Sequence, residues 1–137
     1  MRQYRSDKPR SKRYDLVPLT IDAMNGVIAY TADHGGGSFT ATGDPLTLTH
    51  GYAVGMAPGA VIPANECGPF RLRQVLRSLF HMHGEGRFGT WVKDENVYVD
   101  AIIVFGPHEF DKAIVTALFY GQEAIYNFAT GESEEVN

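Results

Sequence analysis

The chain has 137 residues, 44% of them apolar, which is enough for one compact domain and too few for two of ordinary size. It contains no run of about 18 apolar residues and no leader of the charged, apolar and small-residue type, so we expect neither a membrane span nor secretion. The expected location is the cytoplasm. Its single cysteine, Cys67, cannot form an internal disulfide or supply a thiolate cluster for zinc.

The charge of the chain is divided unevenly along its length. Six of the twelve basic residues and one of the sixteen carboxylates lie in the first thirteen positions, so the remainder has a formal charge of −9. We therefore divide the chain into a basic arm (1–14), a domain (15–132) and an acidic tail (133–137). The arm is almost free of aliphatic residues and is expected to be disordered in isolation. It either contacts nucleic acid, with Tyr4 and Tyr14 as stacking groups, or serves as a solubilising or assembly-contacting tail.

The domain is predicted to begin with a helix over 18–33, stopped by the glycines at 35–37. The segments SFTAT, GYAVGM and AVIP then predict short strands joined by turns at 43–45 and 57–59. A second helix is predicted from Pro69, with Asn65 or Glu66 as its cap. Its apolar face comprises Leu72, Val75, Leu76, Leu79 and Phe80.

The segment RFGTWVKDENVYVDAIIVF predicts a hairpin around a turn at 93–96. Alternation places Asp100 on the same strand face as Tyr98 and Ile102, so its carboxylate needs a partner or an exposed edge. A third helix opening at Pro107 and a last strand, EAIYNF, complete the order α-β-β-α-β-β-α-β. The buried face predicted for the third helix is Phe110, Ile114, Ala117 and Leu118. This order predicts a single α+β domain with helices on one face of a mainly antiparallel sheet.

The second helix and the hairpin contain the candidate binding residues. Arginine suits bidentate recognition of phosphate, and aromatic rings could stack on a base. Trp91 and Tyr98 face each other if the hairpin turns at residues 94 and 95. The predicted contact residues are Arg71, Arg73, Arg77, Arg87, Trp91 and Tyr98, with Phe70 and Phe88 as further stacking candidates. The alternative is that the arginines form a solvated helix face and that Trp91 and Tyr98 are a pair in the core.

Weaker signals point to chemistry. His81 and His83 end the second helix, and a metal site there would need a third ligand such as Asp100. The sequence favours the other interpretation, a histidine-rich helix end, where cations suit the negative end of the helix dipole. His34, His50 and His108 are other possible third ligands. Cys67 near a helix start could have a lowered pKa and act as a nucleophile, or be a small buried residue. The glycines at 35–37 suggest a helix cap and a hinge more than a phosphate cradle.

The segments GTWVKDENVYVDAIIVF and ALFYGQEAIYNFATGE resemble small uncharacterised proteins carried by phages and mobile elements of actinobacteria. The resemblance covers about the last fifty residues, with a further match at GYAVGM, and the group has no established activity. It implies a virus-derived accessory protein in a bacterial cytoplasm. Proteins of this kind frequently counter host defence by binding a defence protein or sequestering a nucleotide signal.

Together these patterns predict a non-catalytic phage-like protein, without a cofactor or metal, that binds and inhibits a host factor. Mimicry of nucleic acid by the acidic body is one way to do so. A nucleotide-sequestering protein, as a homo-oligomer with the ligand between subunits, is the first alternative. A small metal-dependent hydrolase using His81, His83 and Asp100 is the second.

Overall fold

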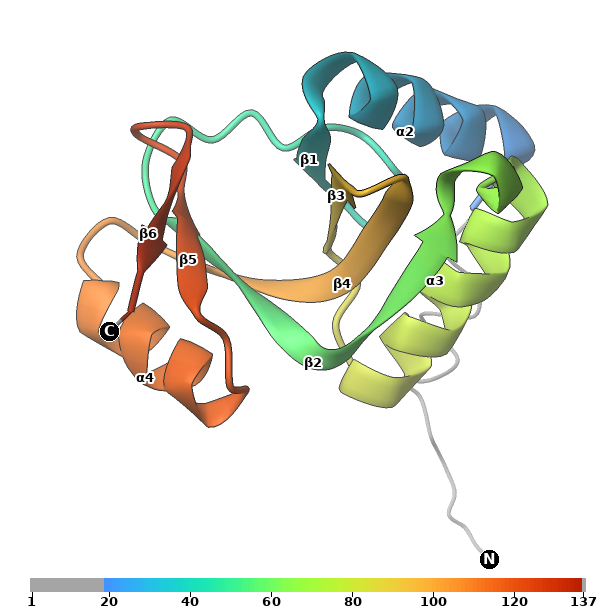
Figure 1. Ribbon diagram of the computed structural model, residues 1–137. Coiled ribbons are helices and arrows are strands. Elements are labelled where there is room, and N and C mark those ends of the chain that lie inside the picture. The colour runs from blue at the N-terminus through green and yellow to red at the C-terminus, as the bar shows by residue number, and fades with distance from the viewer. Residues whose placement is uncertain (1–18, 137) are drawn as a thin grey trace, which may run out of the picture.

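Figure 1 shows the computed structural model of the protein, which describes residues 19–136. The predicted arm (1–14) lies outside these residues. The helices are α2 (Ile21–His34), α3 (Pro69–His83) and α4 (Phe110–Phe119), with a 3-10 helix, η2 (Ala64–Glu66). The strands are β1 (Gly36–Phe39), β2 (Tyr52–Pro63), β3 (Phe88–Lys93), β4 (Asn96–Phe105), β5 (Ala124–Asn127) and β6 (Glu132–Glu135). The described chain is one α+β domain, which confirms the predicted class and order of elements.

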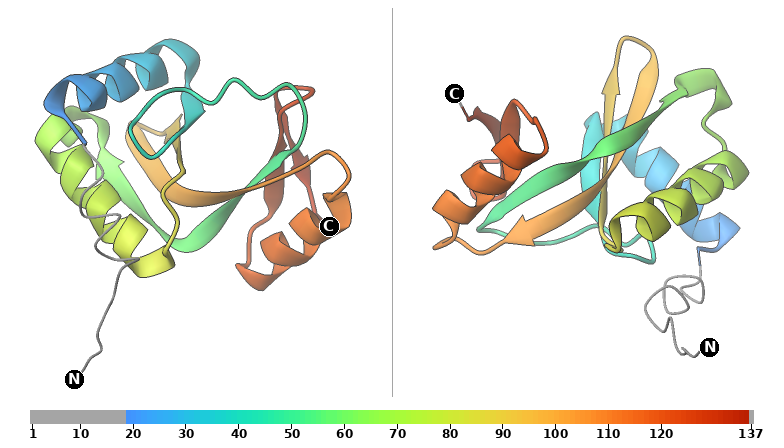
Figure 2. Two further views of the ribbon diagram at one scale, coloured as in Figure 1. Left: turned by 180° about the vertical axis from the view of Figure 1, so that it is seen from behind. Right: turned by 90° about the horizontal axis from the view of Figure 1, so that it is seen from below.

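The six described strands form one antiparallel, strongly curled sheet in the order β1-β3-β4-β2-β5-β6 (Figure 1). The helices α2 and α3 cover one part of this sheet, and α4 lies beside β5 at the other end (Figure 2). Met56 belongs to the core under α2 and α3, and Val54 to the core under α4. Because these residues are two positions apart on β2, they lie on the same face, and we call this the helix face.

The first helix ends at a glycine as its sequence predicts, but it begins at Ile21, three residues after the predicted start at 18. Thr20 caps α2 by accepting a hydrogen bond from Ala23 N–H at 3.0 Å, and Gly35 ends it in the left-handed conformation with φ of 80°. The glycines after Gly35 do not form the expected hinge, because Gly36 and Gly37 belong to β1. A Cβ on Gly36 would lie 2.6 Å from Thr90 O. The backbones of β1 and β3 therefore approach each other so closely here that only glycine fits.

The segment expected as short strands around a turn at 57–59 is instead one strand, β2. Its pairing with β4 shifts register between Met56 and Ala60, so the Ala57-Pro58-Gly59 sequence forms a bulge within the strand. The bulge brings the backbone of Gly59 against Asp100, since a Cβ there would lie 1.9 Å from Asp100 Oδ1. A turn sequence has therefore been accommodated inside the sheet.

The hairpin prediction is confirmed in register and turn. Asp94 and Glu95 have φ of 53° and 66°, as in the two-residue turns with left-handed residues that match strand twist. Trp91 pairs with Tyr98, as predicted. Val97, Val99 and Ala101 are buried on the helix face, so Tyr98, Asp100 and Ile102 lie on the opposite face.

The second helix buries its predicted face: Leu72, Leu76, Leu79 and Phe80 are buried, and Val75 packs against them. Its cap differs from the prediction. Asn65 and Glu66 belong to η2, and Gly68 is the N-cap, with Pro69 at the first helical position.

The buried face predicted for α4 is partly wrong. Ala113 and Ala117 are fully buried and Ile114 is partly buried, but Phe110 and Leu118 are exposed. The small side chains of Ala113 and Ala117 pack with Val54 and Ile125, so the helix turns its large residues outward.

The sheet extends beyond the last predicted strand. Glu132–Glu135, expected mostly as tail, form β6 and pair with β5. Asn127 Nδ2 donates a hydrogen bond to Glu134 Oε2, and Asn127 Oδ1 accepts one from Ala129 N–H at 2.8 Å in the connecting turn. The acidic end is thus part of the domain.

Candidate binding surfaces

The arginines of α3 form a cationic side on the helix. Arg71 and Arg77 are exposed, whereas Arg73 is half-buried and its Nη1 donates to Leu19 O at 3.4 Å, with the guanidinium 5.4 Å from the Phe70 ring centre. Arg87 lies directly before β3 and is exposed, and its backbone carbonyl accepts a hydrogen bond from Ile102 N–H. Within residues 19–136 none of these guanidinium groups forms an ion pair.

The aromatic pair lies elsewhere. The rings of Trp91 and Tyr98 are 5.6 Å apart, and Trp91 is 55% exposed, so the pair is not core. Lys93 Nζ lies 5.6 Å from the Trp91 ring. Because α3 covers the helix face and Trp91 and Tyr98 lie on the opposite face, the fold does not gather the α3 arginines and these two aromatics into one pocket.

The histidines and Asp100 are partly brought together. His83 Nε2 donates to Pro58 O at 2.9 Å on the β2 bulge, and its ring lies 6.5 Å from that of Tyr120. Asp100 is close enough to His83 for its pKa to be affected, yet its carboxylate accepts no hydrogen bond from residues 19–136. These residues contain no group of three or more metal-ligating side chains, so the metal-dependent alternative lacks a ligand set there.

We expect Asp100→Asn to increase the free energy of unfolding at neutral pH. Burial raises the pKa of Asp100, and His83 offsets part of this increase. The native state therefore keeps a proton that the unfolded state releases, and stability falls as pH rises from the ordinary aspartate pKa through the raised native pKa. The advantage of Asp100→Asn should be complete above that range and absent below it.

Urea unfolding at acidic and neutral pH checks this expectation, with Asp33→Asn on the exposed side of α2 as the matched control. A wild-type protein that gains stability relative to Asp100→Asn as pH rises would contradict the assignment.

Of the two interpretations of Cys67, the structure favours a small, partly buried residue over a reactive nucleophile. Cys67 follows η2 and lies before the N-cap of α3, outside the first helical turn. Burial raises the pKa of its thiol, so the protonated form is favoured and the nucleophilic thiolate is disfavoured.

The surface that the sequence analysis missed is the outward side of α4. Val115, Leu118 and Phe119 are 66%, 54% and 79% exposed. Their spacing of three and four residues places them side by side on the helix, and we call these three residues the outer α4 face. Asp111, also exposed, lies one turn earlier on the same side.

The start of α4 is held by Glu109. Its Oε1 accepts a hydrogen bond from Gly106 N–H at 2.7 Å, and this bond lowers the pKa of Glu109. Its other oxygen receives Lys112 Nζ at 3.4 Å. The turn before the helix is thereby closed, and the orientation of the outer α4 face is set by the packing of Ala113 and Ala117.

The outer α4 face stands at an acidic end of the molecule. From residue 106 to 136 the chain has six carboxylates and one lysine, and α4, β5 and β6 lie together in Figure 1. The carboxylates are Glu109, Asp111, Glu123, Glu132, Glu134 and Glu135. An apolar surface at an acidic end of the molecule, with Asp111 beside it, suits a partner that is apolar and basic.

Comparison with known protein families, curated proteins and solved structures finds no match to this chain. No helix within residues 19–136 has the length and apolar character needed to cross a membrane.

Proposed function

We propose that this chain is a non-catalytic accessory protein that binds and inhibits a host protein through the outer α4 face. The observation that carries the proposal is the exposure of three adjacent large apolar side chains on a helix whose small residues face the core. A contiguous exposed apolar patch is a feature of surfaces that bind other proteins. The setting is the bacterial cytoplasm implied by the resemblance to phage and mobile-element proteins.

The charge around this face defines the chemistry of the partner. Asp111 adjoins the outer α4 face, and the end of the domain formed by α4, β5 and β6 carries the other carboxylates. Proteins that bind DNA or RNA present basic groups to phosphates, and carboxylates can occupy the same positions. The partner that fits is a nucleic-acid-binding host protein, inhibited by apolar docking and by mimicry of phosphate charge.

We expect Phe119→Ser to abolish capture of this partner. An exposed aromatic that becomes buried at the centre of an interface contributes about 2 kcal/mol or more to binding, which is roughly thirtyfold in affinity. Tagged wild type and variant are used to capture proteins from bacterial lysate, and the partner identified by mass spectrometry is then titrated in purified form. Phe70→Ser is the matched control, because Phe70 is 66% exposed on α3, away from this face.

Retention of the partner by Phe70→Ser and its loss from Phe119→Ser would support the proposal. Equal binding of the partner by both variants would show that the outer α4 face is not the binding surface. A doubled mass in light scattering that Phe119→Ser abolishes would instead assign the face to a second copy of this chain.

The nucleotide-sequestering alternative is favoured by one observation, the exposed Arg71, Arg77 and Arg87 without ion pairs within residues 19–136. Heating the captured protein and analysing the released small molecules tests it in the same experiment. A released nucleotide that Arg71→Ala/Arg73→Ala/Arg77→Ala no longer retains would favour this alternative over protein binding.

A further inference from the structure

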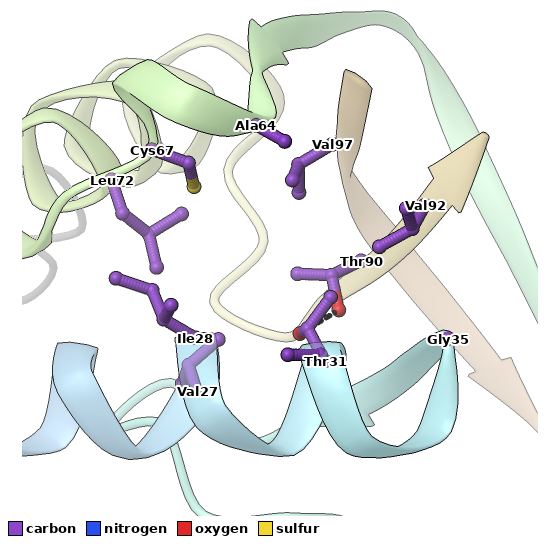
Figure 3. A pocket seen from close by; sticks show the side chains of 11 residues that line it. Val27, Ile28, Thr31, Gly35, Ala64, Cys67, Leu72, Thr90, Val92 and Val97 are labelled. Carbon is purple, nitrogen blue, oxygen red and sulfur yellow. Dashed lines mark hydrogen bonds between the residues drawn. The ribbon is translucent and has the colours of Figure 1, made fainter. Parts of the chain in front are cut away.

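A cavity of about 360 Å³ opens beside the main core, on the helix face of the sheet. Its walls come from the C-terminal half of α2, from the hairpin β3–β4 and from the segment that joins η2 to α3 (Figure 3). The lining includes Val27, Ile28, Leu72, Val92 and Val97. A volume of this size lies within the range of about 300–1,000 Å³ typical of small-molecule sites.

The lining determines what charge an occupant can have. Most lining side chains are aliphatic, and none is ionisable except the Cys67 thiol, which points into the space in Figure 3. An ionised molecule would lose its hydration here without gaining an opposite charge. The cavity is therefore unsuitable for a nucleotide or another anion, and suitable for an uncharged, mainly hydrocarbon molecule.

Two threonines provide the polar feature of this cavity. Thr31 and Thr90 are 4% and 7% exposed, and their hydroxyl oxygens are 2.6 Å apart in a mutual hydrogen bond. Each hydroxyl has one proton to donate, so one mutual bond leaves one proton of the pair unused. Neither hydroxyl forms another hydrogen bond within residues 19–136. A buried donor without an acceptor is unfavourable unless a water or a ligand meets it.

We propose that this cavity binds a neutral, largely apolar small molecule that has one hydrogen-bond acceptor, such as a carbonyl oxygen. The hydrocarbon part lies against the aliphatic walls, and the acceptor receives the unused hydroxyl proton of the Thr31–Thr90 pair. The site is independent of the outer α4 face, because it lies between α2 and the hairpin.

The solvatochromic dye prodan tests the proposal, because it is a neutral naphthalene ketone with the required acceptor. We expect saturable binding at one site per chain, with a blue shift of its emission. Because Cys67 is the chain's only cysteine, its alkylation by N-ethylmaleimide reports on this cavity specifically. Bound prodan should slow the alkylation, and the alkylated protein should no longer bind prodan.

The variant Thr31→Val/Thr90→Val keeps the shape of the pair and removes the donor. It should weaken prodan binding by up to about tenfold, the value of one hydrogen bond. Thr47→Val, the same change in an exposed loop, should leave the affinity unchanged. Binding that does not protect Cys67, or that is unaffected by loss of both hydroxyls, would overturn the proposal. If the double variant does not fold, protection of Cys67 in the wild type decides the question.

Discussion

Replacing Phe88 with alanine should lower the free energy of unfolding by about 3–5 kcal/mol, as expected for a fully buried aromatic whose removal leaves a cavity. Phe88 is 0% exposed, and its ring lies 5.1 Å from that of Phe39 and 6.1 Å from that of Phe80. The three rings connect β1, β3 and α3. Small domains have only about 5–15 kcal/mol of stability in total, so a large part of it would be lost. Urea unfolding at neutral pH measures the change.

Phe119→Ala is the matched control, because it removes the same group from a site that is 79% exposed. It should change stability by no more than about 0.5 kcal/mol, the usual range for a surface substitution. A large loss in Phe119→Ala would show that the outer α4 face is already buried in the isolated protein and would contradict the proposed interface. A neutral Phe88→Ala would contradict the packing of the three rings.

The elements that sequence analysis predicted best are those whose local chemistry allows one arrangement. The second helix has a single apolar stripe, with Leu72, Leu76 and Leu79 at helical spacing, and arginines elsewhere. The hairpin has a polar turn between two β-rich runs, and a two-residue turn at Asp94 and Glu95 determines which residues pair. Pairing of Trp91 with Tyr98 then follows from counting.

The outer α4 face was missed because α4 is apolar on more than one side. In FDKAIVTALF, periodicity alone cannot choose between the predicted face, which contains Phe110 and Leu118, and the observed buried face, which contains Ala113. The choice is made by packing, since small residues are accommodated against Val54 and Ile125. The sequence did contain one signal of an exposed apolar face: this helix has more apolar residues than a single buried stripe can accommodate.

Long-range pairing accounts for the other differences. Residues Glu132–Glu135 have little strand preference, and they form β6 through pairing with β5 and the contact of Glu134 with Asn127. The separation of the α3 arginines from Trp91 and Tyr98 depends on which sheet face the helix covers. Sequence spacing contains no information on that choice, so the predicted joint site could not be tested before the fold was known.

Gly51→Ala should lower the free energy of unfolding by about 3 kcal/mol, because backbone strain of roughly 1–3 kcal/mol is combined with an overpacking cost of similar size. Gly51 has φ of 104°, and a Cβ there would lie 2.4 Å from the backbone oxygen of Phe105. Its carbonyl also accepts Phe128 N–H at 2.9 Å. The residue therefore lies where β2, β4 and the end of β5 meet.

Gly121→Ala separates the two costs. Gly121 has φ of 69°, but nothing lies within 4 Å of the Cβ position, so this variant should lose only about 1–2 kcal/mol from the left-handed conformation. Equal losses in the two variants would show that the close approach at Phe105 has no energetic weight.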